Sequence, residues 1–172
     1  IKIEKPHEEF LASPYPARDI GCLNCHMQTY TGRATPDGPL RNRLHRHDFI
    51  GVDVAVTPFP RLGYQRREVE EFLRTAARLS VFAPQVAVAG GSFKLKVDVK
   101  NVGAGHNLPT GPSTEREMWL EVIAANRSGK ILFESGTLDK QGDLRGGHGN
   151  VKQQDPQLAL FTDRFVDEKG ET

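Results

Sequence analysis

The chain has 172 residues, and its 23 Lys and Arg nearly balance 22 Asp and Glu, which leaves a formal net charge of +1. This length allows one ordinary domain or two small ones, and the balanced charge gives no reason to expect a nucleic-acid partner. Hydrophobic residues make up only 37%, while 17 Gly and 11 Pro favour loops and short strands over a large helical core. No run approaches the roughly 18 apolar residues of a membrane span.

The chain starts with Ile1 rather than Met, without the basic and then apolar pattern of a signal peptide. Its charged C-terminal stretch, DRFVDEKGET, stops abruptly. We therefore expect either a processed mature chain or a piece of a longer polypeptide.

The first 82 residues are predicted to be irregular, with helix in only a few places. Short helical segments are expected at 8–13 and 19–28, and the Gly- and Pro-rich stretch 29–64 is expected to be mostly coil. A coil of that length inside a compact domain is unusual unless it wraps a bound group. One clear helix is predicted at 66–80, because apolar side chains recur there at helical spacing, and Pro84 prevents its continuation. These side chains are Val69, Phe72, Leu73, Ala76 and Leu79.

After residue 83 the hydrophobic pattern changes to that of β-strands. Apolar and polar residues alternate over 92–102, which predicts a half-buried strand with a lysine-rich outer face. Two more strands are expected at 117–125 and 130–134, joined by the hairpin sequence Asn-Arg-Ser-Gly. Weaker strand signals lie at 86–89 and 158–162. We therefore predict an α+β chain, with an irregular and helical part over 1–82 and an antiparallel β-sandwich over 83–172.

One short motif carries the chemistry, Cys22-Leu23-Asn24-Cys25-His26. The pattern C-x-x-C-H is the attachment signature of c-type haem. On a helix, the second cysteine and the histidine follow the first cysteine at spacings that put all three side chains on one face. Cys22 and Cys25 are therefore predicted to form thioethers with the two vinyl groups of one covalent haem c per chain. His26 is predicted to ligate the iron from the proximal side.

Three other uses of the cysteine pair fit the sequence less well. A thioredoxin-like redox motif would follow a βαβ pattern, which is not visible here. A zinc site would need two further ligands, which His45 and His47 can supply. A disulfide between Cys22 and Cys25 would close too small a loop to add much stability.

The second axial ligand of the iron is left open between two histidines. His106 lies in the loop 103–111, whose glycines permit close approach of the backbone to a planar group. His47 precedes Asp-Phe-Ile-Gly, again with an aromatic residue and a glycine nearby. Each can also be an ordinary turn or surface histidine. One iron has only one position left for these two candidates. One of them is therefore not a ligand, or it ligates a different haem, on another chain or on a missing part of this one.

The remaining histidines and methionines are weaker candidates. Met27 adjoins His26 and cannot reach the opposite face of the same haem, whereas Met118 lies in a predicted strand, where a core role is expected. His7 and His148 lie in polar surroundings and are expected to be surface residues.

Several segments form an ordered series along the chain. They are EFLASP at 9–14, CLNCHM at 22–27, HDFIG at 47–51, NVGAGHNLPTG at 101–111, Arg116, WLEV at 119–122 and GKILFESG at 129–136. In this order they resemble the multihaem c-type cytochromes in which the last haem module is followed by a β-rich domain. The resemblance extends over most of the chain.

The resemblance implies electron transfer, with histidine ligation from His47 and His106 as well as His26. It also implies a haem-binding front followed by an immunoglobulin-like β-sandwich. The chain departs from the family pattern in two ways: it carries one C-x-x-C-H motif where the family usually has several, and its β region stops before the family's closing strands. Both departures favour a truncated chain or an unusual member with a single haem.

Two functions follow from these expectations. The first is an electron-transfer module with a low-spin haem ligated by two histidines, which has no open position for a substrate and is therefore a carrier rather than an enzyme. The alternative is a haem subunit of an oxidoreductase for nitrite, hydroxylamine or peroxide, with an open distal face and a basic cluster that stabilises an anion. That cluster, Arg41, Arg43, His45 and Arg46, can equally be a solvated loop or a clamp for the haem propionates.

The expected partners are other cytochrome chains or haem modules, in an oligomer or a larger complex. Haem c is attached outside the cytoplasm, so a periplasmic or extracellular location is expected. Ligation by two histidines lacks the Met that raises the potential, so a lower reduction potential than that of a His/Met cytochrome is expected.

Overall fold

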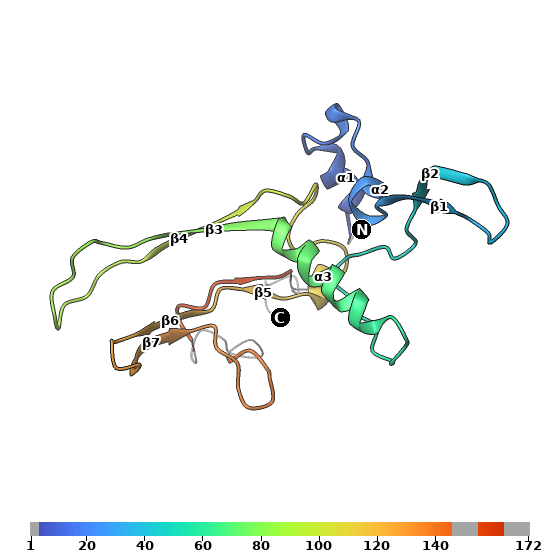
Figure 1. Ribbon diagram of the computed structural model, residues 1–172. Helices are drawn as coiled ribbons and strands as arrows, with labels where there is room; N and C mark the ends of the chain where they lie inside the picture. The colour runs from blue at the N-terminus through green and yellow to red at the C-terminus, as the bar shows by residue number, and fades with distance from the viewer. Residues whose placement is uncertain (1–3, 146–154, 164–172) are drawn as a thin grey trace, which may run out of the picture. The chain divides into compact units, whose positions relative to one another are not determined.

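The computed structural model describes residues 4–145 and 155–163, which contain short helices and antiparallel strands (Figure 1). The α+β class is confirmed at this level. The strands form four antiparallel pairs, each a separate two-stranded sheet, and no barrel closes among the described residues. The chain divides into two compact units, His7–Asn107 and a second unit of Ile1–Pro6 with Leu108–Thr172. The predicted boundary after residue 82 falls inside the first unit.

The first unit opens with three short helical segments, α1 (Pro6–Leu11), a 3-10 turn (Pro16–Arg18) and α2 (Cys22–His26). Pro6 starts α1, where its missing N–H costs no hydrogen bond, and Glu8 and Glu9 suit the positive end of the helix. Helix is therefore present within both segments for which the sequence predicted it, 8–13 and 19–28.

The coil predicted over 29–64 is wrong in its first half, which forms a β-hairpin of β1 (Thr29–Arg33) and β2 (Leu40–His45). No residue of either strand is buried, so the hairpin lacks the alternation of apolar and polar residues by which a strand is recognised. It depends instead on backbone pairing and on the turn between the strands, where the Gly38 N–H donates to the carbonyl of Thr35 at 3.0 Å.

The predicted helix at 66–80 is present but shifted, as α3 (Leu62–Ala76). Its apolar stripe is confirmed in part: Val69 is buried at 3% exposure and Phe72 and Ala76 are half-buried, whereas Leu73 is exposed and Leu79 lies outside the helix. The last predicted turn is instead part of β3 (Ala77–Phe82), which pairs with β4 (Lys96–Asn101) along its whole length, from Ala77 opposite Asn101 to Phe82 opposite Lys96. Pairing with a distant strand overrides the local helical period here.

The strand predicted over 92–102 is confirmed only over β4, where Val97 and Val99 are half-buried between exposed neighbours. Residues 92–95 form no strand, and Phe93 and Leu95 are exposed. The strand predicted at 86–89 is wrong, because these residues lie in the loop between β3 and β4, with a turn in which the Gly91 N–H donates to the carbonyl of Val88 at 3.0 Å. Gly90 has a φ of +78°, which a strand residue does not adopt.

In the second unit, the predicted strand 117–125 is divided into β5 (Met118–Trp119) and β6 (Val122–Ala125). β5 pairs with β8 (Leu160–Phe161), and β6 pairs with β7 (Ile131–Ser135). The hairpin predicted at 126–129 is confirmed: the Asn126 N–H donates to the carbonyl of Lys130 at 2.9 Å, and Gly129 has a φ of +81°.

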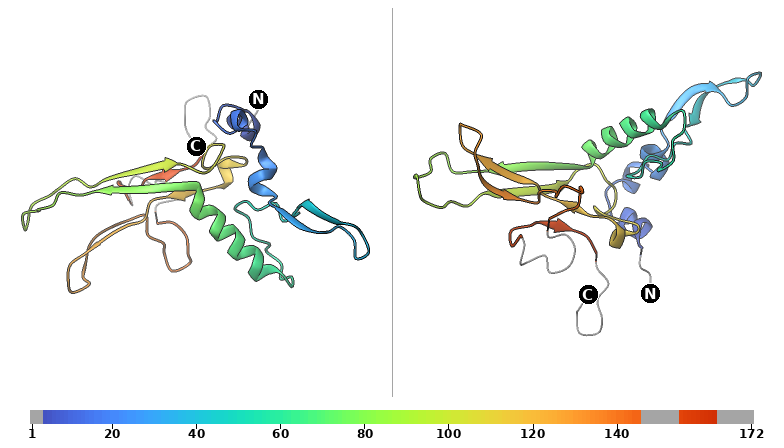
Figure 2. Two further views of the ribbon diagram at one scale, coloured as in Figure 1. Left: turned by 45° about the horizontal axis from the view of Figure 1, so that its top comes forward. Right: turned by 90° about the horizontal axis from the view of Figure 1, so that it is seen from below.

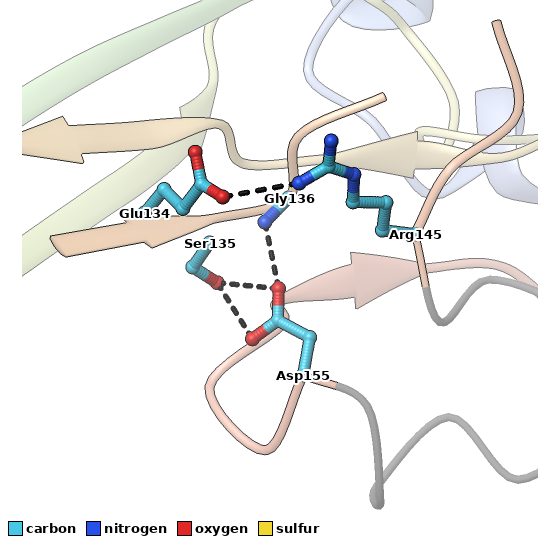
Figure 3. Close-up of polar contacts among 5 residues, drawn as sticks. All are labelled: Glu134, Ser135, Gly136, Arg145 and Asp155. Atoms are coloured by element: carbon cyan, nitrogen blue, oxygen red, sulfur yellow. Dashed lines mark hydrogen bonds and ion pairs between the residues drawn. The ribbon is translucent and has the colours of Figure 1, made fainter. Parts of the chain in front are cut away.

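Asp155 ties the end of β7 to the chain that precedes β8 (Figure 3). Its carboxylate accepts the Ser135 hydroxyl at 3.0 and 3.1 Å and the Gly136 N–H at 2.8 Å. A Cβ on Gly136 would lie 2.1 Å from the carbonyl oxygen of Leu120, so only glycine fits there. A nearby ion pair joins Glu134 and Arg145 at 3.0 Å.

Few side chains of the described residues are buried. The buried hydrophobic residues are Ile50, Val69 and Leu144, and no described side chain falls below 2% exposure. Packing among the described residues therefore removes little apolar surface from water. No helix in the described ranges has the length and apolar character needed to cross a membrane.

Candidate functional site

The C-x-x-C-H motif forms the short helix α2 of the first unit. Gly21 precedes the helix in an extended conformation, and its N–H donates to the side chain of Asn24 at 2.8 Å, which caps the first turn. Cys22 is exposed and Cys25 is half-buried, and both are free thiols. The disulfide considered from the sequence is therefore not formed, and both sulfurs remain available for covalent attachment of a ligand.

His26, the last residue of α2, is held in one orientation by the segment that follows β2. Its Nδ1 lies 2.5 Å from the carbonyl oxygen of Ile50, and the Ile50 N–H donates back to the His26 carbonyl at 3.2 Å. A carbonyl only accepts, so Nδ1 is the donor, and in the neutral tautomer that makes this hydrogen bond the lone pair is on Nε2. A histidine that ligates a metal is typically oriented in this way, by a backbone acceptor for its other nitrogen.

Three aromatic rings surround the imidazole of His26. Phe72, from α3, contacts it edge-on at 5.3 Å between ring centres, and Phe49 lies nearly parallel to it at 5.4 Å. The third ring is His106, whose centre is 6.2 Å away and whose plane is inclined by 14°. Two histidines that are 80 positions apart in the sequence therefore face the same small volume.

His106 has the same tautomer as His26. Its Nδ1 lies 2.9 Å from the carbonyl oxygen of Asn107, so Nε2 again keeps its lone pair. Three hydrogen bonds hold the loop around it. The Asn101 side chain donates to the His106 carbonyl at 2.7 Å and accepts the Ala104 N–H at 3.1 Å, and the Asn107 N–H donates to the Glu9 carboxylate at 3.0 Å.

Two glycines bring the His106 loop into close contact with its supports. A Cβ on Gly103 would lie 2.1 Å from the carbonyl oxygen of Thr75 at the end of α3. A Cβ on Gly105 would lie 2.9 Å from the ring of Phe10 and 3.0 Å from that of Tyr15, whose hydroxyl also donates to the Gly103 carbonyl at 3.2 Å. The glycines thus permit a backbone approach that another residue would block.

The rings of His26 and His106 are stacked, with their centres 6.2 Å apart and their planes inclined by 14°. The structure thus brings a second imidazole to the helix that carries the two free thiols. Thiols and imidazoles are the residue types that would hold a covalently attached haem.

His47 lies elsewhere. It is exposed in the turn after β2, and it makes no ring contact with any described residue. Its neighbours are engaged: the His45 Nδ1 lies 2.7 Å from the Met27 carbonyl oxygen, and Arg46 reaches the Tyr64 hydroxyl at 2.5 Å. Within the described ranges, no three His, Cys, Asp or Glu side chains gather as a metal site. The zinc alternative, which needs four ligands, gains no support from this arrangement.

The structure also describes three of the other candidates. Met118 is half-buried in β5 of the second unit, and His7 is exposed in α1. Met27 ends α2 beside His26. His148 lies outside the described residues.

Sequence reasoning missed the residues that hold the two histidines. Phe72 was assigned to the apolar stripe of α3, and the roles of Ile50, Glu9 and Tyr15 depend on contacts between distant segments. The sequence did contain one signal for Phe49: it is the aromatic residue of the HDFIG segment, close to His47.

Comparison with known proteins adds no relative: no protein-family model, no curated protein and no solved structure matches this chain. The resemblance to multihaem cytochromes stays a prediction from the motifs.

Proposed function

We propose that this chain is a c-type cytochrome module that transfers electrons. Cys22 and Cys25 would bind the haem covalently, and His26 and His106 would be its axial ligands. The observation that carries the proposal is that the C-x-x-C-H helix, with both thiols free, lies against a second histidine, whose ring is stacked on that of His26 at 6.2 Å between centres. When bound, the haem supplies a one-electron couple between ferric and ferrous iron.

The chain's own residues orient the ligands and exclude competing chemistry. The carbonyl of Ile50 fixes the tautomer of His26, and the carbonyl of Asn107 does the same for His106. With His26 and His106 both bound to the iron, a substrate would have no position to bind. This supports a carrier over the alternative, an oxidoreductase subunit with an open distal face.

His47 is the second candidate ligand, and its position favours a different haem. An exposed histidine outside the group around His26 is available to a haem on another chain or module. This supports an assembly with partner cytochromes. We infer a location outside the cytoplasm, because haem c is attached there.

We also infer that the β-rich part belongs to an immunoglobulin-like sandwich. Supporting this, the β3–β4 pair has an apolar face in which Leu79 lies opposite Val99 and Val81 opposite Val97. Leu79 and Val81 are 58% and 62% exposed. An isolated two-stranded hairpin is marginally stable in water, so such a face needs a covering layer.

The test is to express the chain with a haem c attachment system and to compare His106→Ala with His47→Ala. We expect covalent haem and a low-spin spectrum that carbon monoxide does not change. His106→Ala should convert the spectrum to high spin and allow carbon monoxide to bind, whereas His47→Ala should not. Conversion by His47→Ala alone would reassign the ligand. If the unsubstituted protein bound carbon monoxide readily, the carrier function would be wrong.

A further inference from the structure

The loop between β3 and β4 is both uncharged and exposed. Residues 79–93 contain no Asp, Glu, Lys or Arg, and every residue from 81 to 96 is exposed to solvent. The loop closes the hairpin at the end opposite to α3, and Figure 2 shows the paired strands leading from that helix to the loop. We call residues 82–93 the hairpin tip.

The large apolar side chains of the hairpin tip remain in contact with water. Val86 and Val88 are 83% and 80% exposed, and Phe82 and Phe93 are each more than half exposed. The exposure is not confined to one face. Val81 and Phe82 are consecutive residues of β3, so their side chains project from opposite faces of the hairpin, and both are more than half exposed. An exposed apolar cluster of this kind typically marks an interaction site, and a molecule that covers this one must surround it.

The charged residues that border the hairpin tip are basic on both strands. Arg78 precedes the uncharged stretch, and Lys94 and Lys96 follow it. Lys96 lies 3.1 Å from Asp98, which is the only acidic residue between 77 and 101. Arg78 and Lys94 form no ion pair with a described residue. The hairpin therefore combines an uncharged apolar end with a positively charged border.

We propose that the hairpin tip inserts into the interfacial layer of a membrane that contains anionic phospholipids. Its apolar side chains would lie at the boundary between headgroups and acyl chains, and the basic side chains would bind the phosphates of the headgroups. Apolar anchors beside positive charges are the combination that binds a peripheral protein to such a surface. Insertion does not require haem, so it adds a membrane contact to the proposed electron-transfer function without depending on it.

The backbone of the loop limits the depth of insertion. Among the described residues, the segment 84–94 has one backbone hydrogen bond, from the Gly91 N–H to the Val88 carbonyl at 3.0 Å. Backbone groups without a partner are costly in hydrocarbon, where no water can bind them. The hairpin tip is therefore suited to the hydrated interface and not to the acyl core.

A second copy of the chain or another protein fits the hairpin tip less well. Two tips packed together would bring their lysines close to one another, and like charges across an interface repel. A groove on a protein covers one face of a hairpin, whereas the apolar side chains of this hairpin project from both faces. Headgroups and acyl chains can surround such an end.

The first test measures co-sedimentation of the full chain with vesicles of phosphatidylcholine, alone or mixed with an equal amount of phosphatidylglycerol. Val86→Ser with Val88→Ser removes two apolar side chains without changing the charge, and it should weaken binding to the mixed vesicles about tenfold or more. The control, Val52→Ser with Val56→Ser, changes two other exposed valines of the first unit and should bind like the unsubstituted chain. Absence of binding to the mixed vesicles, or equal weakening in the two double variants, would overturn the proposal.

The second test concerns the basic border. One basic residue beside an anionic membrane strengthens binding about fivefold, so Lys94→Gln should bind the mixed vesicles about that much more weakly, and Lys94→Arg should bind normally. Arg41→Gln is the matched control, because Arg41 is exposed in β2 and its loss changes the formal net charge from +1 to 0 in the same way. Equal weakening by Lys94→Gln and Arg41→Gln would mean that only net charge matters, which contradicts binding through the hairpin tip.

The third test shows whether the hairpin tip enters the lipid. Val86→Trp places an indole in the tip, whereas the single tryptophan of the unsubstituted chain, Trp119, belongs to the second unit. Lipid brominated at the headgroup end of its acyl chains should quench the fluorescence of Val86→Trp more strongly than that of the unsubstituted chain. Equal quenching would refute insertion. A dimer that is lost in Val86→Ser with Val88→Ser, in a chain that does not bind vesicles, would assign the tip to a second copy and also overturn the proposal.

Discussion

If His106 ligates a haem iron as proposed, replacing Gly103 by Ala should remove it from the iron without changing either histidine. The new Cβ would lie 2.1 Å from the Thr75 carbonyl oxygen, and the two must separate by about 1.3 Å to reach an ordinary contact of 3.4 Å. Both are backbone-anchored, so the loop of His106 must move. A metal–ligand bond tolerates only about 0.2 Å of error, and the displacement is several times larger. We expect a high-spin spectrum and carbon monoxide binding.

Two other glycines provide a graded comparison. In Gly105→Ala the clash is with the rings of Phe10 and Tyr15, at 2.9 and 3.0 Å, and rings can yield more than a carbonyl in the backbone. Gly63→Ala, in α3, meets nothing within 4 Å and should leave the spectrum unchanged. The high-spin content should therefore be highest in Gly103→Ala, lower in Gly105→Ala and lowest in Gly63→Ala. A low-spin Gly103→Ala protein that does not bind carbon monoxide would refute this account of the His106 loop.

Three further predictions concern the haem ligands and the second unit. Because the two imidazole planes differ by 14°, the ferric protein should give a rhombic low-spin EPR signal; a strongly axial signal with a single large g value would contradict the parallel arrangement. Phe49 has a φ of +42°, a conformation that costs a residue with a Cβ about 1–2 kcal/mol. Urea unfolding should therefore find the Phe49→Gly protein more stable than Phe49→Ala, although glycine is usually the less stabilising of the two residues. Asp155→Ala should lower the free energy of unfolding by about 1–3 kcal/mol, because it leaves the hydroxyl of Ser135, a residue that is 4% exposed, without its acceptor. The control Glu134→Gln, at an exposed ion pair, should lower it by less than about 1 kcal/mol. Equal losses would mean that the Asp155 hydrogen bonds stabilise the protein no more than an exposed ion pair does.

The parts of the fold that could be predicted depend on local chemistry. The stripe containing Val69 and the turn at 126–129 arise from spacings and residue types within a few positions. The end of α3 could not be predicted in this way, because residues 77–82 leave the helix to pair with 96–101, far along the chain. The β1–β2 hairpin was missed for a related reason: without a buried face, it has no hydrophobic alternation to detect.

The same distinction applies to the candidate site. Cys22, Cys25 and His26 are contiguous, so the motif alone identifies them. The choice between His47 and His106 could not be made from sequence, since both sit beside glycine and aromatic residues. His106 is brought to His26 by contacts of its loop with segments from α1 and α3, and those contacts exist only in the folded chain.

A haem bound at the candidate site would account for the small number of buried side chains in the first unit. In the first unit the buried hydrophobic residues are Ile50 and Val69, while Leu23, Phe49 and Leu73 are 46%, 63% and 43% exposed. A bound haem would add a large apolar surface to this unit, and its binding free energy would become folding free energy. We therefore expect the variant with both cysteines replaced by Ala to lose cooperative unfolding by circular dichroism. The fluorescence transition of Trp119, the single tryptophan and a residue of the second unit, should change little. A haem-free chain that melts as cooperatively as the holoprotein would show that the first unit does not depend on the cofactor for its stability.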